Sequence, residues 1–205
     1  MQSKPSKREQ THERIVEVAS RAIRRGGYGG VGVAEIMKEA GLTHGGFYAH
    51  FESRNAMLAE ALAYAGRESS ARVAQRVEAR RAQGESALRI IIESYLGESH
   101  LNGIEQGCPV AALVSEMPRQ APELLAVSAE RVRALIQRVR QALPARPAQA
   151  AAAEATAQLI TSTMVGAVQL ARVLGGDEGK ALLAATRQRL LAQYDGGGNA
   201  DDESH

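Results

Sequence analysis

The chain has 205 residues and a formal net charge of +2, and its length is enough for one or two domains with a buried core. Hydrophobic residues make up 44% of the chain but aromatic residues only 3%, so the apolar content is mainly Ala, Leu, Val and Ile, and the abundant Ala and Leu favour an all-α protein. One cysteine, Cys108, excludes an internal disulfide and a four-cysteine zinc site, and the longest apolar run is shorter than the about 18 residues of a membrane-spanning helix.

The first 55 residues hold more Lys and Arg than Asp and Glu, which suits either a polyanionic partner or an ordinary solvated helix surface. Residues 1–7 are polar and contain Pro5, so we expect a flexible arm without a signal peptide. Residues 8–25 repeat apolar side chains on one face of a helix, and the glycine run at 26–30 ends it.

Two short helices follow, joined by a tight turn. Apolar residues recur at helical spacing over 33–40, Gly41 ends that helix, and Thr43 is a suitable N-cap for a third helix reaching about Phe51. Such a pair is typical of a helix-turn-helix, whose second helix enters the major groove of DNA. A fourth helix, capped by Ser53, is predicted to run to about Arg81.

The rest of the chain also predicts helices. One opens at Ser86, a short apolar stretch covers 110–117, and a longer helix runs from Pro122 to about 143. Two more are expected over about 148–174 and 177–194, the second capped by Asp177, and residues 195–205 are expected to be disordered.

The third helix carries the residues that we expect to read DNA. Its apolar positions pack against the first helix, which leaves hydrogen-bonding or very small side chains on the other surface: Thr43, His44, Gly45, Gly46, Tyr48, Ala49 and His50. Each glycine costs a helix about 1 kcal/mol relative to Ala. Two adjacent glycines therefore suggest that the backbone must approach another surface closely, although a weak helical turn would give the same pattern.

The stretch VAEIMKEAGLTHGGFYAHFESR over 33–54, continuing to Met57 and Leu58, resembles the DNA-binding domain of tetracycline-repressor-type (TetR family) regulators. Close similarity covers about residues 10–65. The resemblance implies a homodimer in which a three-helix helix-turn-helix domain (8–52) precedes a helical effector-binding and dimerisation domain (53–194). It also implies a double-stranded DNA operator, a small-molecule effector and a cytoplasmic location.

The same resemblance assigns roles to individual residues. Thr43, His44 and Gly45 would face base edges, while Tyr48, His50 and Arg54 would contact phosphates. The family usually has Thr or Ser where this chain has Val31 and Gly32, so a phosphate contact at the start of the second helix is left to backbone amides. The expected DNA-binding set is therefore Gly32, Val33, Thr43, His44, Gly45, Gly46, Tyr48, His50 and Arg54.

Two further sites are expected in the second domain. An effector pocket is placed among the helices of 86–143, lined by Tyr95, Cys108, Leu113, Met117 and Leu135. The leucine-rich and alanine-rich helices of 148–194 suit a symmetric four-helix contact between two copies, because closed twofold dimers are the commonest oligomers. The residues expected at that contact are Leu159, Met164, Leu170, Leu174, Leu183 and Leu190.

Other functions find less support. Gly27, Gly29 and Gly32 fit a dinucleotide-binding glycine pattern, but a helical segment precedes them where that fold requires a strand. His44 and His50 would point about 240° apart on a helix and cannot share a metal, and no catalytic motif is present, so no metal, cofactor or enzyme activity is expected. A helical enzyme and a non-DNA interaction module remain as remote alternatives.

Cys108 leaves one alternative open within the regulator class. A helix starting at Pro109 would place its positive end at the thiol and favour the thiolate, as a redox or electrophile sensor requires. A small buried apolar side chain is the simpler interpretation, because free cysteine is among the most buried residue types.

Overall fold

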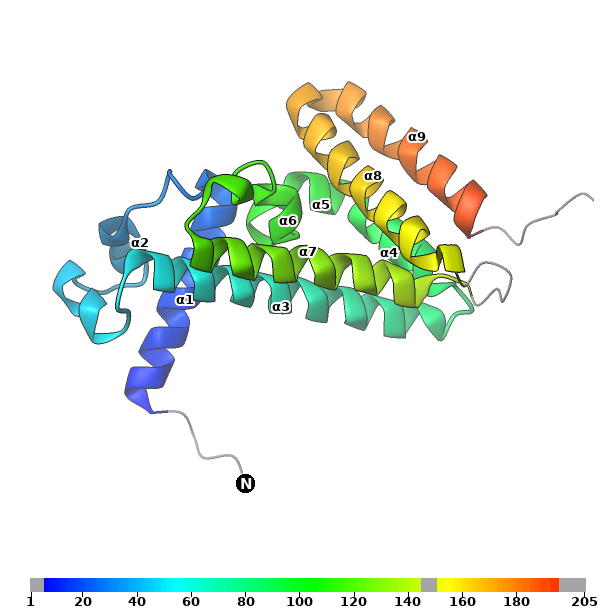
Figure 1. Cartoon of the computed structure of the whole chain (residues 1–205). Helices are drawn as coiled ribbons and strands as arrows, with labels where there is room; N and C mark the ends of the chain where they lie inside the picture. Colours follow the sequence, from blue (N-terminus) through cyan, green and yellow to red (C-terminus); the bar gives the residue numbers. More distant parts are fainter. Residues whose placement is uncertain (1–5, 145–150, 196–205) are drawn as a thin grey trace, which may run out of the picture. The chain divides into compact units, whose positions relative to one another are not determined.

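The computed structural model describes residues 6–144 and 151–195, and every regular element in these two ranges is helical, as the sequence predicts (Figure 1). The chain divides into two compact units. Unit 1 comprises the described residues up to Arg72 together with Asn102–Arg133, and unit 2 comprises Val73–Leu101 together with the described residues from Ala134 onward. Residues 1–5 of the expected arm, 148–150 of an expected helix and 196–205 of the expected tail lie outside the described residues.

Unit 1 begins with α1 (Lys7–Gly26), α2 (Val33–Glu39) and the short 3₁₀ helix η1 (His44–Ala49). The long helix α3 (Arg54–Arg81) starts in unit 1 and continues into unit 2, and α7 (Pro122–Ala142) does the same. Between them, unit 1 also contains η2 (Ile104–Gln106), α6 (Pro109–Leu113) and η3 (Met117–Arg119).

Local sequence signals set these boundaries. Ser6 caps α1 through a capping box with Glu9, and Gly27 ends that helix with a φ of 72°. Gly41 turns the chain after α2 with the same φ, and the Ser53 hydroxyl accepts the Ala56 N–H (3.0 Å) at the start of α3.

The third helix differs from expectation in one respect. It is a 3₁₀ helix that ends at Ala49, two residues before Phe51, and its two adjacent glycines are poor α-helix formers. Thr43 occupies the N-cap position, but its side chain makes no capping hydrogen bond.

Unit 1 has one apolar core with a buried cation in it. The largest of its fully buried side chains come from α1, α2, η1 and α3, and they include Ile15, Ile23, Ile36, Phe47 and Leu58. The Arg24 side chain is completely buried, and it donates to the carbonyls of Ser20 (2.9 Å) and Gly107 (3.0 Å) and to Glu68 (3.0 Å). Burial lowers the pKa of Arg24, and the hydrogen bond that it donates to Glu68 opposes that shift. These bonds satisfy a charge that would otherwise be costly in the core.

Unit 2 contains α4 (Ala87–Tyr95), α5 (Glu98–Asn102, whose last residue belongs to unit 1), α8 (Ala153–Leu174) and α9 (Gly176–Tyr194). Helices α8 and α9 form a hairpin (yellow and orange in Figure 1). A Cβ added at Gly179 would lie 2.4 Å from the Ala171 carbonyl oxygen, so the two backbones touch where the hairpin begins. The expected cap at Asp177 is wrong, because Gly175 is the N-cap and its positive φ lets α9 begin one residue earlier.

Helix α8 is long and apolar enough to cross a membrane by length and composition alone. Several of its side chains, among them Ile160, Met164 and Val168, are completely buried inside the protein. Other apolar residues of α8 are exposed, which makes this helix apolar on more than one face.

Candidate DNA-binding interface

The recognition segment η1 is attached to the rest of unit 1 by aromatic and charged side chains. Phe47 is buried and stacks on Phe51 with 5.5 Å between ring centroids. At the other end of η1, Arg8 of α1 donates from Nη2 to the Ala49 carbonyl oxygen (2.9 Å). His12, one turn after Arg8, stacks on Phe51 (4.5 Å) and its Nε2 lies 2.6 Å from Oε2 of Glu60 in α3. These contacts fix η1 against two long helices.

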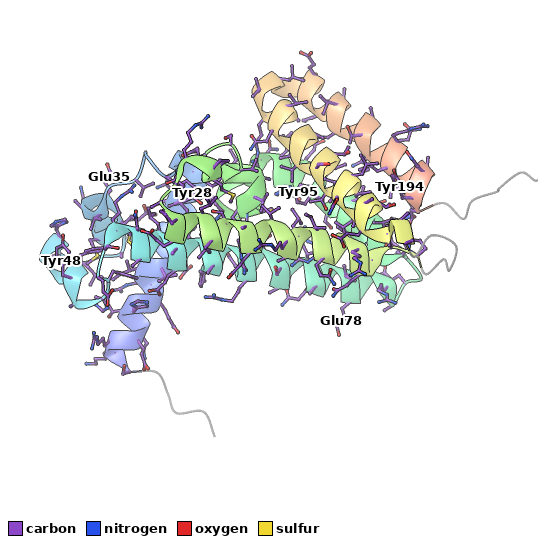
Figure 2. The ribbon with its side chains drawn as sticks, in the orientation of Figure 1. Tyr28, Glu35, Tyr48, Glu78, Tyr95 and Tyr194 are labelled. Atoms are coloured by element: carbon purple, nitrogen blue, oxygen red, sulfur yellow. The ribbon has the colours of Figure 1, made fainter. Side chains whose placement is uncertain are left out.

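The polar side of η1 faces solvent. Thr43, His44 and Gly45 are exposed, and so is the large side chain of Tyr48, with 75% of its surface accessible (Figure 2). Gly32 is also exposed at the start of α2, whereas Val33 and Gly46 are half-buried. The expected base-reading and phosphate-binding side chains of η1 are thus available to a partner.

Packing within the chain does not explain Gly45. A Cβ added there would meet no other atom within 4 Å, and its backbone has no positive φ. At Gly46 an added Cβ would meet only ordinary contacts, the nearest of them Met37 Cε at 3.7 Å. The chain itself therefore has room for alanine at both positions.

His50 follows η1 in a partly buried position. Burial lowers its pKa, and the nearby charges of His12 and Arg8 lower it further. Its Nδ1 is buried without a hydrogen-bond partner in the described chain. An imidazole in this environment is neutral near pH 7 and gains a proton more easily when an anion approaches.

Arg54 has a position that the sequence does not predict. Its Nε and Nη2 donate to the Val31 carbonyl oxygen at 3.3 and 3.1 Å, and Nη2 also donates to the Tyr28 carbonyl oxygen. Arg54, the first residue of α3, therefore binds the loop that leads into α2. Its Nη1 takes part in none of these bonds, so a phosphate contact stays a prediction.

Sequence reasoning missed the residues that support the site. Arg8, His12 and Glu60 bind groups far along the chain, and none of them belongs to a motif of its own. The only signal for Arg8 and His12 is their spacing of four residues, which places both on one face of α1.

The expected effector-pocket residues are all buried, and they divide between the two units. Cys108, Leu113 and Met117 belong to unit 1, whereas Tyr95 and Leu135 belong to unit 2. Cys108 is the N-cap of α6, as its position before Pro109 suggests. A pocket formed by these five residues stays a prediction.

Only some of the residues expected at the dimer contact are exposed enough to reach a second copy. Met164, Leu183 and Leu190 are buried within the chain and belong to its own core. Leu159, Leu170 and Leu174 are 52%, 59% and 43% exposed, so they are available to a second copy. Val173, which the sequence analysis did not select, is 85% exposed on the same helix.

A helix-turn-helix held on a long first helix, with a polar exposed recognition segment, defines a DNA-binding regulator. The family model "Bacterial regulatory proteins, tetR family" matches residues 15–61, and the model "Transcriptional regulator LmrA/YxaF-like, C-terminal domain" matches residues 85–188. The chain belongs to the TetR family of transcriptional regulators. The fold class and the family expected from the sequence are both confirmed.

Solved structures agree with this assignment. A TetR transcriptional regulator from Chloroflexus aurantiacus is 25% identical, with a TM-score of 0.72 over 91% of this chain and 94% of that one. A TetR family regulator from Agrobacterium tumefaciens is 20% identical, with a TM-score of 0.71 over 91% and 98%. The reduced form of Escherichia coli NemR is 17% identical, with a TM-score of 0.72 over 90% and 98%. No curated protein sequence matches the chain.

Proposed function

We propose that this protein is a ligand-released repressor that binds a palindromic operator as a dimer. The observation that carries the proposal is the exposed polar side of η1, where Thr43, His44 and Tyr48 face solvent while Phe47 anchors the segment. The first residues of a recognition helix reach base edges in helix-turn-helix proteins, and flanking residues bind phosphates.

The glycine at position 45 supports close approach to DNA. Gly45 is exposed, and an added Cβ would meet open space within the chain. Glycine loses more conformational entropy on folding than alanine, and packing within the chain does not require glycine at this position. Close approach of the η1 backbone to the floor of the major groove would account for glycine at position 45.

The outer face of α8 supports dimerisation. Leu159, Gly166, Leu170 and Val173 fall within about 60° of one another around the helix. The three large residues of this group are exposed, and a Cβ added at Gly166 would meet open space. An apolar stripe with a small residue at its centre suits close packing against the same stripe of a second copy in a twofold interface.

A dimer would place two recognition segments on successive turns of the same face of DNA, about 34–36 Å apart. An effector would release the operator by binding more tightly to a form in which this spacing is different. The five buried residues expected in its pocket, Tyr95, Cys108, Leu113, Met117 and Leu135, remain our proposal for that site, and the cytoplasm remains our proposal for the location of the protein.

Selection of bound sequences from random duplex DNA tests the proposal. Repression by a dimer predicts a palindromic consensus whose half-sites are centred about 10 base pairs, or a multiple of that, apart. Light scattering of the protein alone should give about twice 21.8 kDa. Failure to enrich any sequence, or enrichment of a single half-site by a monomer, would refute it.

The redox alternative through Cys108 stays a prediction with a simple test. Cys108 is buried at the start of α6. Oxidants or electrophiles should release wild-type protein from the operator and leave Cys108→Ser bound. If they release neither protein, Cys108 is a packing residue.

A further inference from the structure

One carboxylate links the two parts of the chain that the two family models match. Glu116 lies within the C-terminal model (85–188), and Tyr28 lies within the N-terminal model (15–61). Oε2 of Glu116 accepts the backbone N–H of Tyr28 at 2.9 Å, across 88 residues of sequence. Both residues belong to unit 1, so the bond is internal to one compact body.

The contact is close and depends on glycine. Gly27 has a φ of 72°, and a Cβ added there would lie 2.3 Å from Oε1 and 2.8 Å from Oε2 of Glu116. The carboxylate thus occupies the space that a side chain at position 27 would need. Any larger residue at this position would have to displace the Glu116 carboxylate.

The same loop residue is bound from its other side. The Tyr28 carbonyl oxygen accepts a hydrogen bond from Arg54, which also binds the Val31 carbonyl oxygen, and the Tyr28 ring is 2% exposed (labelled in Figure 2). Glu116 therefore binds the N–H of a residue whose C=O is bound by the first residue of α3. The loop held in this way leads directly into Gly32, the N-cap of α2.

Because α2 packs on η1 and the loop sets where α2 begins, a change in the Glu116 bond alters the placement of the helix-turn-helix. We propose that Glu116 is a positioning residue for operator binding, which acts through the Tyr28 peptide on the loop 27–32 and on Arg54. The inference rests on the proposed DNA-binding function, and it assigns part of that function to a residue outside the helix-turn-helix. Glu116 touches no DNA in this scheme.

Three variants of the full chain separate positioning from folding. Glu116→Ala removes the acceptor, Glu116→Gln keeps an oxygen acceptor without the charge, and Glu98→Ala is the matched control because Glu98 pairs with Lys180 in unit 2 (3.2 Å). The DNA probe is the duplex enriched from random sequences by wild-type protein. Thermal unfolding of each variant reports whether the fold is kept.

We expect Glu116→Ala to bind this duplex about tenfold more weakly, an effect of the size that mutations away from a binding site have when they are coupled to it. Glu116→Gln should recover most of the affinity. Glu98→Ala should bind like wild type. The backbone amide of Tyr28 should exchange with deuterium at least about tenfold faster in Glu116→Ala than in wild type, since its hydrogen bond is lost.

Reciprocity supplies the second measurement. If the Tyr28–Glu116 bond is coupled to operator binding, the duplex should slow hydrogen exchange at the Tyr28 amide of wild-type protein, and this added protection should be smaller in Glu116→Ala. Equal affinities of Glu116→Ala and wild type, or exchange at Tyr28 that ignores the duplex, overturn the inference and leave the proposed function intact. A failure to enrich any duplex overturns both.

Discussion

The recognition segment in unit 1 and the α8–α9 hairpin in unit 2 are held in place by different chemistry. In unit 1, arginine side chains bind main-chain carbonyls far along the sequence, at Ala49, Gly107 and Val31. In unit 2, Arg172 of α8 also donates to the carbonyls of His100 and Leu101, but the hairpin itself is joined by direct backbone contact between Gly179 and Ala171 and by buried apolar side chains. A hydrogen bond depends on the orientation of its donor and acceptor, whereas apolar packing is non-directional.

The difference matches the partner that we propose for each unit. A recognition segment must present hydrogen-bonding groups in a set orientation, and the arginine bonds of unit 1 provide that rigidity. The outer face of α8 must present apolar area to a copy of itself, and its exposed Leu159, Leu170 and Val173 do so. Five substitutions test this contrast, from the largest expected effect to the smallest.

Leu170→Glu should prevent dimerisation through the exposed apolar face of α8. A charge in the centre of a buried interface is costly, so we expect a species of about 21.8 kDa by light scattering and operator affinity reduced about 100-fold or more, because the two half-sites are no longer linked. Leu170 is 59% exposed in the protomer, so its unfolding temperature should change little. Leu125→Glu, at a 43% exposed leucine of α7, is the control that should remain a dimer.

A substitution at Leu183 separates the core of the protomer from the proposed dimer interface. It is 2% exposed within the chain, so Leu183→Glu should unfold the protomer rather than only separate the dimer. A well-folded monomer of Leu183→Glu would show that this leucine lies at the interface after all.

His44→Ala should lower operator affinity by a smaller amount than Leu170→Glu. Loss of one base contact costs about 1–3 kcal/mol on the operator and relaxes the preference at one base pair in each half-site. Binding to scrambled duplex should change little, because phosphate contacts carry no sequence information. Titration of both duplexes checks this, and equal weakening on both would move His44 to a phosphate-binding role.

Gly45→Ala should separate stability from binding. Stability should stay equal or rise by about 0.5–1 kcal/mol, because the chain has room for the methyl group and alanine loses less entropy on folding. Operator affinity should fall about tenfold if the η1 backbone approaches DNA closely, as one misplaced recognition contact does. Unchanged affinity of Gly45→Ala would remove the argument for close approach.

The smallest effect concerns pH. Burial holds the pKa of His50 below its ordinary value in the free protein, and a bound phosphate favours the imidazolium and raises that pKa. Protons are therefore taken up on binding, and operator affinity should increase a few-fold as the pH falls from about 7.5 to about 6. The same titration with His50→Gln should lose this part of the pH dependence, and identical slopes would show that His50 does not contact phosphate.

Local signals made much of the fold predictable. The glycine run after α1, Gly41 after α2 and the Ser53 hydroxyl before α3 placed these helix ends within a residue or two, because such residues act on the backbone next to them. The start of α1 was predicted less well, since Ser6 and Lys7 of the expected arm are the cap and first residue of that helix. The hydrogen bonds from Arg8 to Ala49 and from the Tyr28 N–H to Glu116 span 41 and 88 residues, and no periodic pattern encodes such a pairing. On α8 and α9, leucines fall on several faces, so the sequence did not distinguish Leu183 in the core from Leu170 at the surface.

Arg24 makes the completion of the DNA-binding region depend on chain that is synthesised later. Its buried guanidinium needs the Glu68 carboxylate and the Gly107 carbonyl, and the second acceptor lies beyond the midpoint of the chain. A nascent chain that ends at Ala61, where the N-terminal family model ends, lacks both acceptors. On the ribosome, the helix-turn-helix therefore reaches its final stability only after residue 107 has emerged, and a regulator truncated before that point leaves the buried Arg24 cation without at least one of these two partners.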